Sequence, residues 1–300
     1  MPESTVYADP MQRAFPNDWM VPDWPAPAHV QAICTTRQGG VSLAPWDSLN
    51  LGNHVGDNPL HVAANRAQVQ AALGVPAVFM NQVHGCDVLA LPQEPKLHEA
   101  TGATAPAASA DACLTRARGL ACSIQVADCL PVLFTNLQGQ WVAAAHAGWR
   151  GLAGVAMPVS QSAGAPPAST AGGVLAQVVK RLSALSEGGP AANAGEIIAW
   201  LGPCIGPQAF EVGAEVKAAF VANNAAADPF FTPTGNGKWR ADLAGLARLR
   251  LQALGITRIY GNDSTVPWCT VGNPSRFFSH RRDGVRLGAS GRQAAFIWRV

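Results

Sequence analysis

Short apolar segments that follow one another without an intervening helix constrain the fold of this chain more than any other feature. Segments 120–126, 131–135 and 140–145 are each rich in apolar residues, which predicts three successive strands. Further strands are predicted at about 29–36, 78–83, 87–91, 196–201, 258–260 and 294–299, and helices at 59–73, 174–185, 212–223 and 240–254. This order differs from the regular strand–helix alternation of a doubly wound sheet. We therefore predict a mixed α/β fold.

The composition indicates a globular chain with a sizeable core. Hydrophobic residues make up 48% of the 300 residues and charged residues 13%, which excludes a disordered chain, because disorder requires low hydrophobicity and high net charge. The formal net charge is +2 and no segment carries a dense basic run, so we expect no nucleic-acid partner. The longest uncharged stretch, 151–179, contains Pro158, Pro166 and Pro167, so it does not predict a transmembrane helix, and we expect no membrane association.

The cysteines and the low-complexity segments bear on location and domain organisation. The seven cysteines are scattered and odd in number, unlike the disulfide framework of a small secreted protein. Residues 1–10 lack the basic and apolar regions of a signal peptide, so we expect a cytoplasmic protein. The proline-rich residues 1–28 are predicted to form an N-terminal extension. Segments 99–110 and 158–173, rich in Ala, Gly, Pro, Ser and Thr, are predicted to be surface insertions.

Three polar clusters at the ends of predicted strands are the candidates for chemistry. They are 81–85 (NQVHG), 126–131 (VADCLP) and 145–151 (AHAGWRG). The predicted hairpin between Cys129 and His146 can return the chain to the end where it began, so the two side chains can share a pocket. Together with His84 they would form a zinc set with one position open, as catalytic zinc requires. The spacing also fits a buried cysteine and a histidine satisfied in a turn, and it matches none of the short zinc signatures.

Ten short motifs run through the chain over about residues 29–299. They are TTRQGGVS (35–42), SLNLG (48–52), HVGD (54–57), NR (65–66), NQVHG (81–85), ADA (110–112), ADCLP (127–131), HAGWRG (146–151), GPCIG (202–206) and FSHRRDG (278–284). In these motifs and in their order the chain resembles the YfiH/laccase-domain family. The ADC and HAGWRG motifs are the most distinctive. In the last motif His280 stands where many relatives carry Tyr.

The resemblance implies a single α+β domain over residues 29–300, with mixed sheets layered with helices. It implies a catalytic metal site of His84, Cys129 and His146 that holds zinc or, as the alternative metal, copper. Ligands of a zinc ion should place their donor atoms within about 4 Å of one another. The older label of the family is multicopper laccase. Three ligands cannot build several copper centres, and no His-x-His pair occurs in the sequence, so we do not expect laccase activity.

The resemblance also implies an enzyme that acts on small-molecule purine nucleosides. The expected reaction is phosphorolysis of adenosine, inosine, guanosine and 5′-methylthioadenosine, with inorganic phosphate, to the free base and (methylthio)ribose 1-phosphate. A second expected reaction is the hydrolytic deamination of adenosine. The sequence does not rank the nucleosides or define the oligomeric state.

Four further residues of the motifs are assigned to substrate binding. Arg37 follows a strand in an Arg-Gln-Gly-Gly turn and is expected to hold phosphate through a bidentate contact. Arg150 lies shortly after the HAG segment, where it would either bind phosphate or pair with an acidic residue. Asn50 and Gln82 are the other two assigned residues.

Two other functions stay open. In the first, Cys129 is the nucleophile of a metal-free cysteine hydrolase or amidase acting on cell-wall precursors, with His146 or His84 as its base. In the second, the chain is a zinc-stabilised binding protein without catalytic activity. Asp111 and Asp128 are expected to order the site rather than to react.

Overall fold

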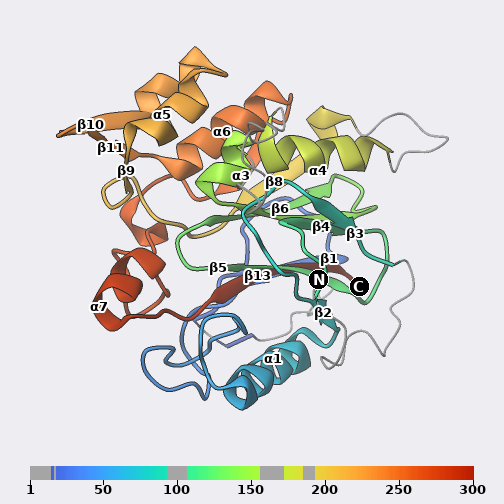
Figure 1. The fold of residues 1–300 in the computed structure, drawn as a ribbon. Helices are drawn as coiled ribbons and strands as arrows, with labels where there is room; N and C mark the ends of the chain where they lie inside the picture. The colour runs from blue at the N-terminus through green and yellow to red at the C-terminus, as the bar shows by residue number, and fades with distance from the viewer. Residues whose placement is uncertain (1–14, 17, 93–106, 156–171, 185–192) are drawn as a thin grey trace, which may run out of the picture.

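Two β-sheets face each other at the centre of the computed structural model, which describes residues 15–16, 18–92, 107–155, 172–184 and 193–300 (Figure 1). The first sheet has the strand order β1 (Val30–Cys34), β13 (Gln293–Arg299), β5 (Ala121–Val126) and β2 (Ala77–Val78). The second has the order β12 (Arg258–Gly261), β8 (Ile197–Leu201), β6 (Leu130–Asn136), β7 (Val142–Ala147), β4 (Ala112–Thr115) and β3 (Val88–Ala90). Both sheets contain parallel and antiparallel pairs, which confirms the predicted mixed α/β fold.

The alternation of side chains along the strands explains why the two sheets pack face to face. In β13, Ala295 and Ile297 lie in the apolar layer between the sheets, whereas Phe296 lies on the opposite face. In β7, Ala144 lies in the layer between the sheets and Ala143 faces away from it. Because both faces of each sheet are covered, the central strands are apolar on both sides.

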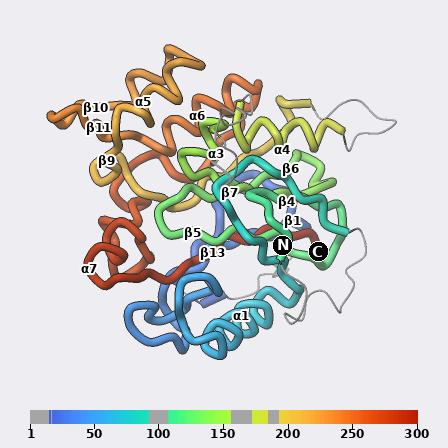
Figure 2. Tube along the Cα trace, in the orientation of Figure 1, coloured from blue at the N-terminus to red at the C-terminus, as the bar shows by residue number. Residues whose placement is uncertain are grey.

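Helix α1 (Pro59–Leu73) covers the outer face of the first sheet (Figures 1 and 2). Its bounds agree with the prediction from the sequence, because its end signals are strong. The side chain of Asn58 accepts a hydrogen bond from the Leu60 amide, Pro59 occupies the first helical position, and Gly74 ends the helix in the left-handed conformation. Val69 and Leu73 pack against the sheet.

Four helices cover the outer face of the second sheet. They are α3 (Trp149–Ala153), α4 (Gly173–Ala184), α5 (Ala214–Val221) and α6 (Leu243–Ala253). Apolar side chains of these helices and of the outer face of β6 and β7 pack into one hydrophobic core cluster. The chain is thus a single domain in four layers, helix, sheet, sheet and helices, as the resemblance implied.

A small third sheet beside α5 corrects two predicted helix ends. It consists of β9 (Glu211–Val212), β11 (Lys238–Ala241) and β10 (Phe231–Gly235). The start of the predicted helix 212–223 and that of 240–254 therefore belong to strands. Asn236 and Gly237 both have positive φ, as a two-residue hairpin turn requires, and this Asn-Gly pair is the local sequence signal for the hairpin.

The remaining short elements complete the chain. They are the 3₁₀ turns η1 (Ala194–Glu196), η2 (Ala225–Phe230) and η3 (Val266–Trp268), the π turn η4 (His280–Gly284), and α7 (Val285–Leu287). No helix within the described residues has the length and apolar character needed to cross a membrane.

The segments predicted to lie outside the core are described only in part. In the N-terminal segment 1–28, Trp19 is buried and Met20 exchanges two backbone hydrogen bonds with Cys34, so this part packs on the domain. Most of 99–110 and 158–173 lies outside the described residues. Of the first, Ala110 is buried; of the second, Gly173 begins α4.

Candidate functional site

The hairpin of β6 and β7 brings Cys129 and His146 to one end of the second sheet. Cys129 directly precedes β6, and His146 lies opposite Pro131 near the end of β7. His146 is on the same face of β7 as Ala144, which faces the layer between the sheets. The imidazole of His146 therefore points into the edge of that layer, beside the thiol of Cys129.

His84 reaches the same place from the loop that follows β2. The donor atoms of His84, Cys129 and His146 all lie within 4.8 Å of one another. His84 has a φ of 61°, a left-handed conformation that a side-chain-bearing residue rarely adopts. Such strain persists only where the surroundings enforce it, and it is common at functional sites.

Asp111 enforces this conformation and also orients His146. Its buried carboxylate accepts backbone hydrogen bonds from His84 at 2.8 Å, from Gly85 at 2.6 Å and from Val83 at 3.2 Å. The same carboxylate binds Nδ1 of His146 at 2.8 Å, so Nε2 of that ring is left for a ligand. Burial by itself would raise the pKa of Asp111, but these hydrogen bonds hold it below its ordinary value.

The charges of Cys129 and His146 are coupled. Burial alone would raise the pKa of Cys129, but the charge of His146 and hydrogen bonds from His146 and His84 lower it to about 6. Burial alone would lower the pKa of His146, but Cys129 and Asp111 raise it to about 9. A thiolate facing an imidazolium is therefore the stable form near neutral pH.

Backbone geometry lets the three groups approach so closely. A Cβ atom on Gly148 would lie 3.0 Å from both Sγ of Cys129 and Cδ2 of His84, so only glycine leaves this space free. Asp128 has a φ of 97°, and its carboxylate accepts hydrogen bonds from the Thr270 hydroxyl and the Arg281 amide. Asp128 thus fixes the turn before Cys129.

This donor set fits a zinc ion. Two imidazoles and one thiolate are zinc ligands, a carboxylate orients one imidazole, and three protein ligands leave one position open. The largest separation of the donor atoms, 4.8 Å, is somewhat wider than the 4 Å expected from the sequence.

The three groups line a cavity of about 290 Å³ whose lining combines apolar and basic side chains. The apolar ones are Trp149, Ile205, Phe210 and Leu243. The basic ones are His54, His280, Arg281 and Arg292, and the guanidinium of Arg281 lies 5.7 Å from the ring centre of Phe210. A cavity with an apolar wall and a few convergent polar groups is the usual form of a small-molecule site.

The structure brings only one of the four predicted substrate residues to this cavity. Gln82 lines it, and its side-chain amide exchanges two hydrogen bonds with the backbone of Gln125. Asn50 is buried outside the lining and accepts a hydrogen bond from the Arg292 amide. Arg150 is not part of the lining, and its guanidinium lies over the ring of Trp149, 4.3 Å from the ring centre.

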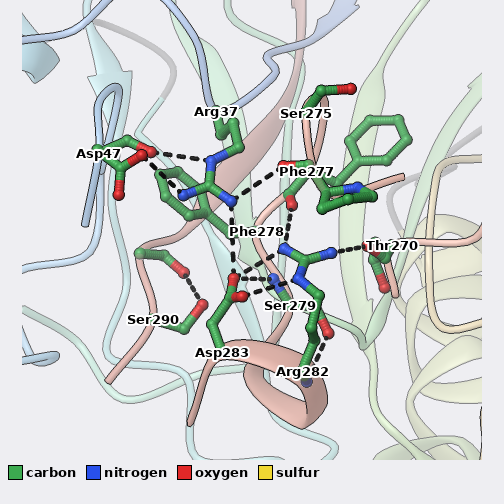
Figure 3. A network of polar contacts seen from close by, with 12 residues as sticks. Arg37, Asp47, Thr270, Ser275, Phe277, Phe278, Ser279, Arg282, Asp283 and Ser290 are labelled. Atoms are coloured by element: carbon green, nitrogen blue, oxygen red, sulfur yellow. Dashed lines mark hydrogen bonds and ion pairs between the residues drawn. The ribbon is translucent and has the colours of Figure 1, made fainter. Parts of the chain in front are cut away.

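Arg37 lies in a separate buried network (Figure 3). Its guanidinium donates to the carbonyl oxygens of Asp47 and Pro274, at 2.9 and 3.0 Å, and forms ion pairs with the Asp47 and Asp283 carboxylates. It also lies over the ring of Phe278. These contacts occupy the side chain, so the structure does not place it where a substrate could bind.

We expect Arg37→Ala to destabilise the fold rather than to impair substrate binding. Removing one member of a buried ion-pair network should lower the free energy of unfolding by about 3 kcal/mol. Urea unfolding measures this change, and kcat/KM per folded molecule should stay close to the wild-type value. The exposed Arg240→Ala is the matched control and should leave stability almost unchanged. A selective rise in the KM for phosphate with unchanged stability would contradict this assignment.

Several residues of the cavity lining have no role predicted from the sequence, among them His54, His280 and Arg292. His54 and His280 stand in recognised motifs, but nothing in their spacing ties them to the candidate metal ligands. Arg292 directly precedes β13, and pairing of β13 with β5 carries it to the turn that leads to Cys129. Only the strand pairing reveals that placement.

Comparison with known proteins gives matches along nearly the whole chain. The profile of a family described as multi-copper polyphenol oxidoreductase laccase matches residues 31–300. A protein of Escherichia coli named purine nucleoside phosphorylase YfiH is 44% identical over 283 residues, covering 94% of this chain and 98% of the relative. A purine nucleoside phosphorylase of Pseudomonas aeruginosa is 42% identical over the same length and coverage.

Solved structures also match this chain over nearly its whole length. The crystal structure of a Neisseria meningitidis protein superimposes with a TM-score of 0.76 at 41% identity, covering 94% of this chain and 99% of that one. That of the Bacillus licheniformis protein YfiH gives a TM-score of 0.75 at 31% identity, covering 90% and 93%.

Proposed function

The chain belongs to the YfiH-like family described as multi-copper polyphenol oxidoreductase laccase, and from this membership we propose that it is a purine nucleoside phosphorylase. The observation that carries the proposal is the convergence of His84, Cys129 and His146 on a cavity lined by both apolar and basic side chains. The relatives that bear the phosphorylase name at 42–44% identity support it. The proposed substrates are adenosine, inosine, guanosine and 5′-methylthioadenosine, with adenosine deamination as a second activity.

The cavity offers each part of these substrates a partner. The purine base packs on the apolar side chains of the lining, among which Trp149 and Phe210 supply aromatic surface. The basic side chains of the lining attract the phosphate that phosphorolysis consumes. Gln82, held by two hydrogen bonds to the backbone of Gln125, adds a polar group to the lining.

We propose that His84, Cys129 and His146 hold zinc, with copper as the alternative metal. When bound, such an ion supplies a Lewis acid and lowers the pKa of a coordinated water, the chemistry that deamination needs. Asp111 binds Nδ1 of His146, so Nε2 would be available to hold the ion. Within the described residues these three form one ligand group, whereas a multicopper oxidase needs several copper centres.

Product analysis with adenosine tests the proposed reactions. Adenine that forms only when phosphate is present indicates phosphorolysis, and inosine that forms without phosphate indicates deamination. Absence of both products from a folded, metal-loaded protein would reject the proposal. We also propose the cytoplasmic location expected from the sequence, since the seven cysteines are thiols rather than disulfides in the described part of the chain.

One observation favours the cysteine hydrolase as a second candidate. Asp111, His146 and Cys129 form a chain in which a carboxylate orients an imidazole and the imidazole stabilises a thiolate. This is the arrangement of a cysteine nucleophile with its base. Measurement of bound metal separates the two candidates, since one zinc per chain leaves no free thiolate to attack a substrate.

The metal-free protein should show an unusually acidic thiol at Cys129. Because the thiolate is the reactive form and its pKa is about 6, alkylation by iodoacetamide should be fast above pH 6 and slow below it. An ordinary cysteine would show its midpoint at about pH 8.5. Mass spectrometry of the Cys129 peptide after chelation measures the midpoint.

His146→Asn provides the control for this measurement. Without the imidazolium, the midpoint of alkylation should move toward higher pH, and added zinc should protect the wild-type thiol. A wild-type midpoint near that of an ordinary cysteine would contradict the coupling of Cys129 and His146.

A further inference from the structure

Among the described residues, the basic side chains of the cavity lining form no ion pair with a carboxylate; they are His54, His280, Arg281 and Arg292. Nη1 of Arg292 donates to the carbonyl oxygens of Ser290 and Gly291 at 2.9 and 3.0 Å. Across the part of the chain that the structure describes, no ion pair joins Arg292 to a carboxylate, and Nε and Nη2 have no hydrogen-bond partner. Nε and Nη2 of Arg292 are therefore available to donate hydrogen bonds to a ligand.

A second arginine, Arg66, lies close to the cavity and also forms no ion pair among the described residues. Nε of Arg66 donates to the Leu51 carbonyl, and its Nη2 lies 3.4 Å from the side-chain oxygen of Gln125, a cavity residue. The guanidinium lies 4.0 Å from the ring centre of Phe79. Among the described residues it forms no ion pair, so burial lowers its pKa to about 10.

The nearby acidic groups are already engaged. Asp128 accepts from Thr270 and the Arg281 amide, and Asp111 accepts from the His84 loop and from His146. The Cys129 thiolate and Asp128 attract Arg292 through space without touching it. Neither provides the contact that a partly buried cation requires.

Among the basic side chains of the lining, His54 responds to the positive charge around it. Partial burial lowers the pKa of His54, and the charges of Arg292, Arg66, His84 and His146 lower it further. An anion placed among these groups would remove their mutual repulsion. Arg281 is different, because its Nη1 donates to the carbonyl oxygens of Ala209 and Glu211 and the side chain is exposed.

We propose that Arg292, together with His54, binds a tetrahedral oxyanion, and that in the proposed reaction this anion is the inorganic phosphate. The subsite rests on the proposed function for the identity of the anion, but not for its position. Arg292 supplies the free Nε and Nη2 pair for a bidentate contact, and the metal-ligand cluster closes the site from the side of Cys129. The subsite replaces the role that the sequence suggested for Arg37.

Asn50 is the positioning residue of this subsite. Its Oδ1 accepts the Arg292 amide at 2.9 Å, and its Nδ2 donates to Asp57 at 2.8 Å. The stem of Arg292 passes against Gly52, where a Cβ atom would lie 2.7 Å from Cγ of the arginine. Both contacts hold the side chain toward the cavity.

The test compares Arg292→Gln with the matched control Arg181→Gln, an exposed arginine of α4, in the metal-loaded protein. Phosphorus NMR titration measures the Kd of inorganic phosphate directly, and steady-state kinetics measures the KM values for phosphate and adenosine. Arg292→Gln should raise the Kd and KM for phosphate by about 10–100-fold and change the KM for adenosine little. Arg181→Gln should behave as wild type.

Two conservative variants keep the proposal testable if Arg292→Gln does not fold. Arg292→Lys should restore only part of the phosphate affinity, because a single ammonium lacks the planar fork. His54→Gln should weaken phosphate binding without changing the bound metal. Unchanged phosphate binding in folded Arg292 variants would overturn the subsite.

The two readouts separate this inference from the proposed function. If wild type binds phosphate through Arg292 but never releases adenine from adenosine, the subsite stands and the phosphorylase proposal fails. If the Arg292 variants lose affinity for adenosine 5′-monophosphate but not for inorganic phosphate, the anion is the phosphate of a nucleotide, and the assignment to the co-substrate is overturned.

Discussion

Cys129→Ser should lower the phosphorolysis of adenosine by at least about 10³-fold while leaving the fold intact. Changes in residues behind a metal ligand already cost about 10–100-fold, and Cys129 is itself the anionic donor of the set. A serine hydroxyl keeps the size of the side chain but does not ionise near neutral pH, so it cannot replace the thiolate. The loss should appear in kcat/KM, and bound zinc should fall with it.

The neighbouring Cys86→Ser is the matched control. Its Sγ donates to the Gly151 carbonyl at 3.4 Å, a contact that a serine hydroxyl can replace, and it is not part of the ligand group. Activity and metal content should stay near wild type. If Cys129→Ser retained zinc and activity, neither the metal site nor the cysteine nucleophile would be correct.

Asp111→Asn should be the most damaging substitution outside the ligands. The carboxylate accepts two hydrogen bonds on each oxygen, from Val83 and Gly85 on Oδ2 and from His84 and His146 on Oδ1. In either orientation an asparagine turns its NH₂ group toward two N–H donors. We expect a loss of about 3–5 kcal/mol in the free energy of unfolding and about a 10–100-fold loss in metal affinity.

The pH dependence gives this prediction a second readout. Because the folded protein holds the pKa of Asp111 below its ordinary value, the carboxylate stabilises the fold above that ordinary value and ceases to do so as the pH falls through the lowered pKa. The stability gap between wild type and Asp111→Asn should therefore be complete at neutral pH and shrink below about pH 4. The exposed Asp87→Asn is the control and should show no gap. A gap that persists unchanged in acid would contradict the role of the carboxylate.

Local signals in the sequence predict most of the fold. Helix α1 carries its own cap at Asn58 and its own stop at Gly74, and the buried strands are continuous apolar runs. The secondary-structure prediction fails where tertiary contacts determine which element forms. Strand β9 has only two residues, and it exists because β11 pairs with it.

The residues of the candidate site likewise fall into those that the sequence predicts and those that only tertiary contacts reveal. His84, Cys129 and His146 lie at strand ends within motifs, so their convergence could be anticipated from the sequence. Arg37 looked like an anion ligand because of its glycine turn, yet its acidic partner Asp283 comes from the far end of the chain. Arg292 reaches the cavity through the pairing of β13 with β5, which no local pattern encodes.

In the proposed reaction, this cavity transfers the ribose of a purine nucleoside to phosphate. The most direct measurement is the amount of ribose 1-phosphate formed per adenine released from adenosine, across a titration of inorganic phosphate with the metal-loaded protein. We predict one ribose 1-phosphate for each adenine, with no adenine when phosphate is absent and a rate that saturates as phosphate rises. Adenine released with free ribose, or at a rate independent of phosphate, would show that the enzyme is not a phosphorylase.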